Sequence, residues 1–363
     1  VGVEGSNPFT RSTTIMVLLF KRKTTLNYFS IILLIFIFKG CVSYKENGPY
    51  SLNEQEKQEA LLQKKILITE MANSSKKIHK IAWPILRNNS TICKKSSTYS
   101  YGMLFASPED IPEQENFLFK VLFNSKINKY LYDDYEVNSF PIILSVAKDS
   151  PADLAGLENN DVILKINDKN TKNFRKSFKK SITHSNKLKV LVFRNGNIIE
   201  KKIEGINICD YSIQPFPAGS PNAFADGKKV FITIAAIKLA ESDDELAFLI
   251  GHELAHNIFH YNTGGASEAY TESINYLDRP KIRNVSAIFT WTNEKRETEA
   301  DIEGTKIAFK GGYNLDKVSD YWRRLSVFNP NYIKQSSYIY RSNAARAVII
   351  NKTLKKLKEE KNK

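Results

Sequence analysis

The segment DDELAFLIGHELAHNIFHY, residues 243–261, constrains the fold of this chain most strongly. Its apolar residues recur at the spacing of a helix whose surface is largely buried. Ser242 and Glu245 match a capping box, which marks where such a helix begins, and the acidic residues after Ser242 suit its positive end. The chain therefore has to build a core around a helix that begins near residue 243.

This helix carries two histidines and a glutamate in the order His-Glu-x-x-His. His252 and His256 are four residues apart, so their side chains lie one above the other on one helix face. Glu253 stands beside them, where its carboxylate can reach a metal-bound water without binding the metal. The spacing is typical of zinc peptidases. The alternative is a pair of core histidines, which would leave Glu253 buried without a partner.

A catalytic zinc site needs a third protein ligand and one open position. The extended motif with a third histidine fails here, because its glycine and histidine positions hold Phe259 and Asn262. His260 lies on roughly the same face as His252 but too far along the helix to share the metal.

A glutamate on a second helix is the other way to complete the site. The segment TNEKRETEADIEGTKIAFKGGYN offers Glu297 and, four residues later, Asp301. The two carboxylates share a helix face, so a ligand and an acceptor for a histidine ring N–H can come from the same helix.

His-Glu-x-x-His followed about 40 residues later by Glu-x-x-Ala-Asp-x-x-Gly and then Gly-Tyr resembles the HtpX and CAAX-prenyl-protease family of metallopeptidases. Within that family the chain is similar to secreted members that carry a PDZ domain. The resemblance implies one zinc ion per chain held by His252, His256 and Glu297, with Glu253 as general base and Asp301 hydrogen-bonded behind the ligands.

The family also has a His-Pro pair near its C-terminus, with an arginine six residues after the histidine. Arg346 matches that arginine, which places Tyr340 and Arg341 where His-Pro is expected. A tyrosine hydroxyl can donate to an oxyanion but is a poor zinc ligand at neutral pH. The resemblance implies Arg346 as a partner behind the ligands and Tyr340 as the oxyanion donor; a bystander role for Tyr340 is the alternative.

Residues 112–205 are rich in short apolar runs that predict strands: FLFKVLF, FPIILSVA, DVILKIN and KLKVLVFRNG, with a hairpin at Asn195-Gly196. Between them, SPADLAGLENNDVILKINDKNT resembles the PDZ signature of secreted bacterial proteases, with Asn159/Asn160 and Asp168 in place of two glycines. A PDZ domain binds an extended peptide as an added strand, so the resemblance implies peptide C-termini as ligands. The alternative is a spacer or lid.

The N-terminal segment sets the expected location. From Met16, a basic stretch precedes the apolar run SIILLIFIF, which is too short to span a bilayer comfortably, and Gly-Cys follows at 40–41. This pattern resembles a bacterial lipoprotein signal with Cys41 as the lipidated residue; an uncleaved anchor is the alternative. We expect a periplasm-facing cell-envelope protein with a lipid anchor in the membrane, and Val42 favours the outer membrane over the inner one.

With Cys41 lipidated, Cys93 and Cys209 remain, and an oxidising compartment favours a disulfide between them over two free thiols. The two cysteines flank the PDZ-like region, so a bond would make that region an insertion in the peptidase. The net charge of +14 comes from dispersed Lys and Arg, which predicts solvated surface, some attraction to anionic lipid and no nucleic-acid partner.

Two further segments carry structural predictions. NEQEKQEALLQKKILITEMANSSKKIHKIAWPIL predicts a helix with a capping box of Asn53 and Glu56, an apolar stripe that includes Leu62 and Ile66, and an end or kink at Pro84. KKVFITIAAIKLA predicts a strand running into a turn, and an extended substrate is expected to pair with the strand around residues 228–236.

The expected fold class is α+β, with a mainly helical zincin-type metallopeptidase domain that has a small sheet, plus an inserted PDZ-like β-rich domain. The expected boundaries are 1–15 for an extension before the true start, 16–40 for the signal peptide, 41–111 for a tether and the N-terminal helical part, 112–205 for the PDZ-like domain and 206–363 for the metallopeptidase domain. The expected function is zinc-dependent cleavage of unfolded or misassembled envelope proteins. The alternative is a latent or non-enzymatic lipoprotein adaptor or chaperone with a vestigial zinc site.

Overall fold

The computed structural model describes residues 52–93, 97–124, 140–171, 174–176, 178, 186–261, 293–337 and 341–363. The predicted signal region with Cys41 and the predicted oxyanion donor Tyr340 lie outside the described residues. The packing described here is that of residues 60–363, which form one compact unit. Among the described residues, none of the helices is both long and apolar enough to cross a membrane.

Helix α3 (Glu54–Asn88) begins with the predicted capping box. The Asn53 N–H donates to the Glu56 carboxylate at 2.7 Å, and the Glu56 N–H donates to Asn53 Oδ1 at 2.9 Å. The predicted apolar stripe is wrong at its start, because Leu62 and Ile66 are 53% and 69% exposed. The buried face of α3 begins further along the helix, where the packing partners are.

Of the two outcomes predicted for Pro84, an end of the helix is wrong, because α3 remains helical for another turn. A proline removes one N–H donor from the helix. The donor missing at Pro84 would have served the Lys80 carbonyl, and the Tyr313 hydroxyl donates to the neighbouring carbonyl of Ile81 at 2.9 Å. Ile85 and Leu86 directly after the proline are fully buried, so packing holds this last turn in place.

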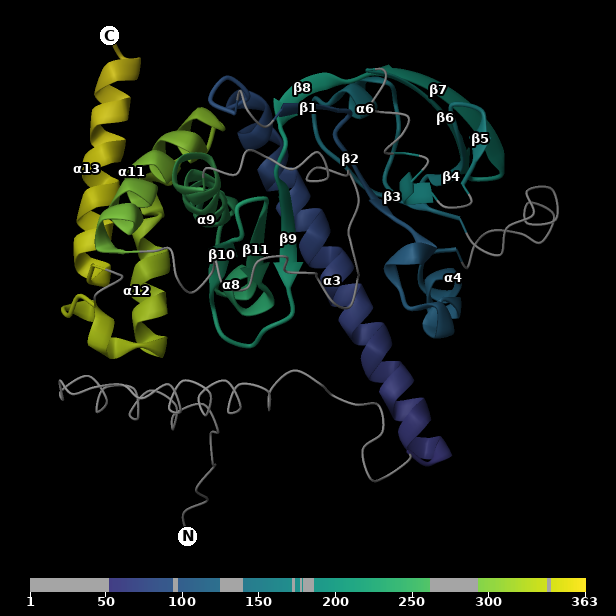
Figure 1. Ribbon diagram of the computed structural model, residues 1–363, viewed down its shortest axis with the longest axis horizontal. Coiled ribbons are helices and arrows are strands. Elements are labelled where there is room, and N and C mark those ends of the chain that lie inside the picture. Colours follow the sequence, from purple (N-terminus) through teal and green to yellow (C-terminus); the bar gives the residue numbers. More distant parts are fainter. Residues whose placement is uncertain are drawn as a thin grey trace, which may run out of the picture. The chain divides into compact units, whose positions relative to one another are not determined.

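The PDZ-like part is a six-stranded sheet in the order β2-β3-β4-β6-β7, with β5 paired to β4 (Figure 1). Its strands are β2 (Met103–Ala106), β3 (Ile142–Val146), β4 (Val162–Ile166), β5 (Lys169–Asn170), β6 (Lys187–Arg194) and β7 (Asn197–Glu204). β2 pairs antiparallel with β3, so the sheet begins before the predicted boundary at residue 112. β2 is a four-residue strand after a polar stretch, too short to form a recognisable strand pattern.

FLFKVLF was predicted to be a strand, but it forms helix α4 (Phe117–Phe123). Leu118 and Phe119 are fully buried, whereas Phe117 and Val121, four residues apart, are about half exposed. This is the burial pattern of a helix with one apolar face inward. An unbroken apolar run does not alternate, so its periodicity alone cannot distinguish a strand from a helix.

The turns of the PDZ-like part follow their sequence signals. Ser150 caps helix α6 (Pro151–Leu154) by accepting a hydrogen bond from the Asp153 N–H. Asn160 and Asp168, which stand where the PDZ signature has glycines, have positive φ angles of 70° and 62°. The hairpin between β6 and β7 turns at residues 195–196, which also have positive φ.

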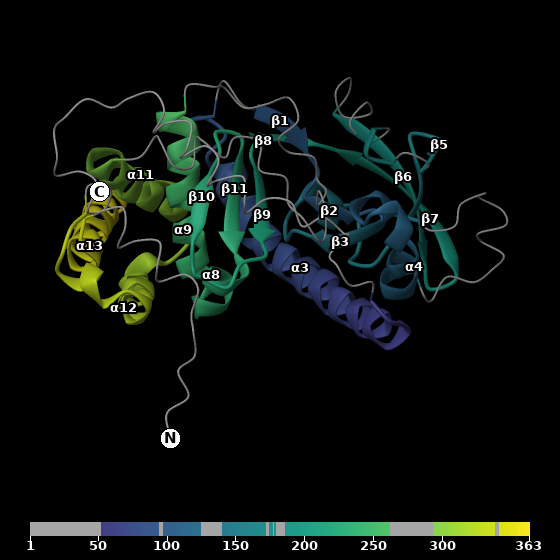
Figure 2. The same ribbon diagram turned by 60° about the horizontal axis from the view of Figure 1, so that its bottom comes forward.

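The peptidase part combines a small sheet with helices (Figure 2). Its elements are β9 (Ser212–Phe216), β10 (Ala223–Ala225), β11 (Lys229–Thr233), α8 (Ile234–Leu239), α9 (Asp243–Ala255), α11 (Glu294–Lys310), α12 (Ser319–Phe328) and α13 (Asn343–Lys361). The sheet order is β10-β11-β9. Residues 234–239 are a helix and not the predicted turn, because the Thr233 hydroxyl accepts from the Ala236 N–H and caps the helix start at 3.1 Å.

Segments on both sides of the six-stranded sheet meet in the peptidase core. Strand β1 (Ser97–Ser100) pairs with β8 (Ile206–Cys209), and a disulfide joins Cys93 to Cys209 beside this pair. Buried residues of α3 share one hydrophobic cluster with residues of α8, α9 and α11. The chain thus enters the six-stranded sheet from the peptidase core and returns to the same core after it. The six-stranded sheet is therefore an insertion in the peptidase part.

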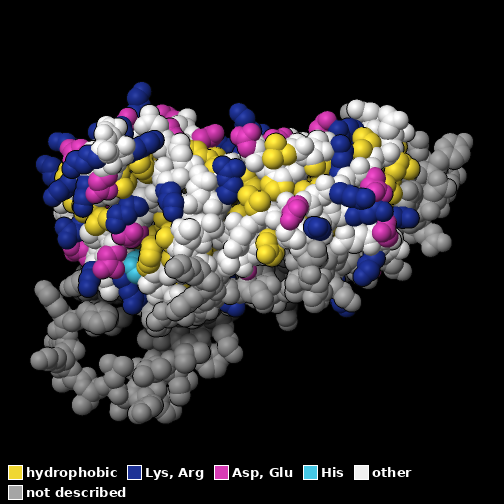
Figure 3. All heavy atoms as spheres, turned by 90° about the horizontal axis from the view of Figure 1, so that it is seen from above, with side chains coloured by type: hydrophobic (Ala, Val, Ile, Leu, Met, Phe, Trp, Pro, Cys, Tyr) yellow, Lys and Arg dark blue, Asp and Glu magenta, His cyan; other side chains and the backbone are white. Residues whose placement is uncertain are grey.

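The charged side chains follow no single-sign pattern on the face shown in Figure 3. Lys and Arg side chains lie interspersed with Asp and Glu side chains there. This matches the dispersed charge of the sequence, and it describes a solvated surface.

Candidate metal centre

The site begins with a close crossing of helices α9 and α11. A Cβ atom on Gly304 would lie 2.6 Å from the Cα and N atoms of His252, and one on Gly251 would lie 2.5 Å from the Gly304 carbonyl oxygen. Only residues without a side chain allow two helix backbones to approach this closely. Glu297, two turns before Gly304 on α11, is thereby placed beside the histidines of α9.

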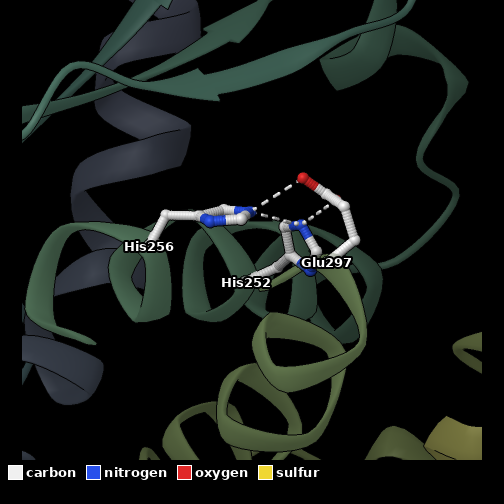
Figure 4. Close-up of side chains that lie close together, drawn as sticks. All are labelled: His252, His256 and Glu297. Atoms are coloured by element: carbon white, nitrogen blue, oxygen red, sulfur yellow. Dashed lines mark hydrogen bonds and ion pairs between the residues drawn. The ribbon is translucent and has the colours of Figure 1, made fainter. Parts of the chain in front are cut away.

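Three side chains converge at this crossing (Figure 4). The Nε2 atoms of His252 and His256 each lie 3.3 Å from an oxygen of Glu297, and 3.2 Å from each other. The three donor atoms lie within 4.8 Å of one another, and all three residues are buried. The structure therefore brings together the three residues that the sequence nominates as metal ligands.

The ring of His252 is fixed from behind by a buried ion pair. Its Nδ1 atom lies 3.0 Å from Asp301 Oδ1. Arg346 on α13 donates two hydrogen bonds to Asp301, from Nε at 2.9 Å and from Nη2 at 2.7 Å. The Arg346 guanidinium also lies over the Trp322 ring, 4.0 Å from its centroid. The site thus includes both residues that were predicted to stand behind the ligands.

The charges of the site suit a cation. Burial opposes the charged form of His252, but hydrogen bonds to Asp301 and Glu297 outweigh it and raise the His252 pKa to about 10. Burial also opposes the ionised form of Glu297, yet the two histidines hold its pKa well below the usual range. An ionised carboxylate and two imidazoles whose Nε2 atoms point at one spot are the donor set of a catalytic zinc site. The residues present therefore fit that metal.

Glu253 lies next to the ligands and is only 7% exposed. Burial raises its pKa to about 7, and the nearby charge of His252 opposes this shift. A carboxylate with a pKa near neutrality can both accept and return a proton, which is the requirement for a general base and acid. Its position and its pKa thus suit the role that the sequence motif assigns to it.

A cavity of about 410 Å³ opens over these residues and has two unlike walls. One wall is strand β10, and the other presents apolar and aromatic side chains of α12 and the turn after it, including Trp322, Phe328 and Tyr332. The sequence-based assignment of the substrate strand to residues 228–236 is wrong. That strand is β11, which lies between β10 and β9 with both edges paired, whereas β10 borders the cavity and pairs with no second strand among the described residues.

The sequence did not predict the positions of Tyr261 and Glu299 at the site, or the contact of His260 with His256. Tyr261 lines the cavity and donates its hydroxyl to the Ala225 carbonyl at 3.0 Å. His260 is outside the ligand group, as expected, but its ring lies against His256 and reaches Glu299. The four-residue spacing from His256 to His260 was the one signal available for this contact.

Comparisons with known proteins give one family match in each of the two parts of the chain. Residues 205–345 match peptidase family M48, and residues 142–192 match the PDZ domain. The M48 match includes His252, His256 and Glu297. Both matches agree with the resemblance of the motifs to the HtpX and CAAX-prenyl-protease family and to PDZ domains.

Two individual proteins extend this comparison. The mitochondrial metalloendopeptidase OMA1 of Saccharomyces cerevisiae is 28% identical over 122 residues, which cover 31% of this chain and 35% of the yeast protein. The chain thus matches about a third of that relative's length. The crystal structure of the HtrA3 PDZ domain bound to a phage-derived peptide matches 31% of this chain and 88% of that domain, with 18% identity and a TM-score of 0.21.

Proposed function

We propose that this M48 protein is a membrane-tethered zinc endopeptidase that cleaves unfolded or misassembled polypeptides of the cell envelope. The observation that carries the proposal is the convergence of His252, His256 and Glu297 beside Glu253, in a cavity bordered by an edge strand. A zinc ion held there would lower the pKa of water and polarise the scissile carbonyl.

The protein supplies the proton transfer and the substrate alignment. Glu253 would accept a proton from the attacking water and return it to the leaving amine. An extended peptide would add to the outer edge of β10, because β10 pairs only with β11 among the described strands. Strand addition requires a chain without its own secondary structure, which favours unfolded substrates.

The aromatic wall of the cavity supports the same substrate class. The side chains of Trp322 and Leu325 face the cavity, and Phe328 at its border is 62% exposed. Bulky apolar residues are buried in folded proteins and become accessible in unfolded ones. A peptide with a large apolar side chain next to the scissile bond would therefore fit this wall.

The PDZ-like part would bind peptide C-termini along the outer edge of its sheet. Strand β2 is the terminal strand of that sheet, so its second edge has no strand partner among the described residues. Binding at the PDZ-like part would hold substrates near the cavity on the peptidase part.

The proposed membrane tether and envelope location rest on the sequence of residues 16–41 alone.

The test is cleavage of an unfolded protein such as casein by the full chain. Glu253→Gln should reduce turnover by several orders of magnitude while zinc binding is retained, because the amide cannot accept a proton. Glu303→Gln is the matched control and should behave like the parent chain, because Glu303 is partly exposed on α11 and pairs with Lys306 instead of a residue of the site. A folded, zinc-loaded parent chain without activity would instead support the adaptor alternative.

A further inference from the structure

The second ring nitrogen of His256 has a partner that the family motif does not name. His256 Nδ1 lies 2.9 Å from His260 Nδ1, and the opposite nitrogen of His260, Nε2, lies 3.2 Å from Glu299 Oε2. The His260 side chain is 9% exposed, whereas Glu299 is 47% exposed. A line of contacts thus runs from the candidate metal ligand to a carboxylate at the surface.

The backbone between the two histidines creates this contact. Residues His256–His260 form a π-helical turn, with the Tyr261 N–H donating to the His256 carbonyl at 3.1 Å. This wider turn places the two rings with their centroids 5.0 Å apart. π-helical turns within α-helices occur frequently at functional sites.

Only one arrangement of protons satisfies every contact once His256 binds a metal through Nε2. The Nε2 lone pair is then used, so the proton of the neutral ring is on Nδ1 and donates to His260. His260 accepts at Nδ1, which places its own proton on Nε2, where it donates to Glu299. Each member of the line therefore fixes the tautomer and the ring orientation of the next.

We propose that His260 and Glu299 are positioning residues that hold His256 in the tautomer and orientation needed for metal binding. The inference rests on the proposed function, because it assumes that a metal occupies the site. Metal-binding histidines almost always donate their second ring N–H, and loss of the acceptor typically weakens metal affinity about 10–100-fold.

The experiment measures zinc affinity of the full chain by competition with a chelating dye, and follows the visible spectrum after cobalt substitution. His260→Ala should weaken zinc binding about 10–100-fold and change the cobalt spectrum. His260→Gln should restore most of the affinity, because its amide oxygen can accept from His256 and its amide nitrogen can donate to Glu299. Glu299→Gln should give a smaller loss, and Glu303→Gln should give none.

Two results would overturn the proposal. One is His260→Ala with unchanged zinc affinity. The other is His260→Gln as weak as His260→Ala, which would show that only the shape of the ring matters. If His260→Ala fails to fold, His260→Gln and Glu299→Gln decide the question. The proposal then requires that His260→Gln binds zinc nearly as tightly as the parent chain and that Glu299→Gln binds it more weakly. A parent chain that binds no zinc would instead defeat the proposed function itself.

Discussion

The two histidines of the candidate metal centre have very different residues behind their rings. His252 faces Asp301, which is 1% exposed and is bound by Arg346 beneath Trp322. His256 faces a neutral histidine and, beyond it, a carboxylate that is about half exposed. His252 is thus held by a buried charged network, and His256 is held by a line of contacts that ends at the surface.

This difference predicts different effects on the free energy of unfolding and on metal binding. Removal of one partner of a buried ion pair destabilises the fold strongly, since the other charge is left buried without compensation. An exposed carboxylate contributes little to the free energy of unfolding. We therefore expect changes on the His252 side to affect folding and metal binding together, and changes on the His256 side to affect metal binding almost alone.

The largest expected effect is that of Asp301→Asn. The change leaves the buried Arg346 guanidinium without its counter-charge and should lower the free energy of unfolding by about 3–5 kcal/mol. Urea denaturation of the metal-free protein measures this directly. Parent-like stability of Asp301→Asn would show that the network on the His252 side is not part of the core, and the comparison would fail.

The second-largest loss of stability is expected from Gly304→Ala, at the crossing of α9 and α11 that positions His252. Gly304→Ala would place a methyl group 2.6 Å from the backbone of His252, so α9 and α11 must move apart. We expect a loss of about 1–3 kcal/mol, as for overpacking in a core, together with weaker zinc binding. Gly219→Ala is the matched control, because a Cβ there meets nothing within 4 Å. Equal melting temperatures of the two variants would refute the role of the crossing.

The pH dependence of zinc binding tests the charge of the His252 ring in the metal-free protein. Hydrogen bonds overcome burial and raise the His252 pKa to about 10, so the metal-free ring is protonated at neutral pH. Zinc must displace that proton, and its apparent affinity should therefore rise about tenfold per pH unit between pH 7 and 9. Calorimetry in two buffers of different ionisation enthalpy should find about one proton released per zinc ion. Release of no proton would contradict the assigned charge.

The smallest effect is expected for Glu299→Gln. Its carboxylate is 47% exposed, so the free energy of unfolding should change by no more than about 0.5 kcal/mol. Urea denaturation under the conditions used for Asp301→Asn gives the value. A loss as large as that of Asp301→Asn would erase the distinction between the two sides of the site.

The local parts of this architecture were predictable from the sequence, because they depend on residues close together in the chain. His252 and His256 share a face through helical spacing alone, and Asn160 and Asp168 adopt the positive φ angles that their turn positions require. The pairing of Cys93 with Cys209 followed from counting cysteines.

What could not be predicted depends on contacts between distant segments. The edge position of β10 follows from the order of the strands in the sheet, which strand patterns do not encode. The stacking of Arg346 on Trp322 and the approach of Gly251 to Gly304 require the packed core. Helix α4 was mistaken for a strand because the choice between the two is made by its packing partners.

The measurement that tests the central claim most directly is a zinc titration of the metal-free full chain, with casein cleavage followed at each step. We predict that activity rises linearly and reaches a plateau at one zinc ion per chain, and that Glu253→Gln binds the same amount of zinc without gaining activity. Cleavage by the metal-free chain, or by zinc-loaded Glu253→Gln, would contradict the account.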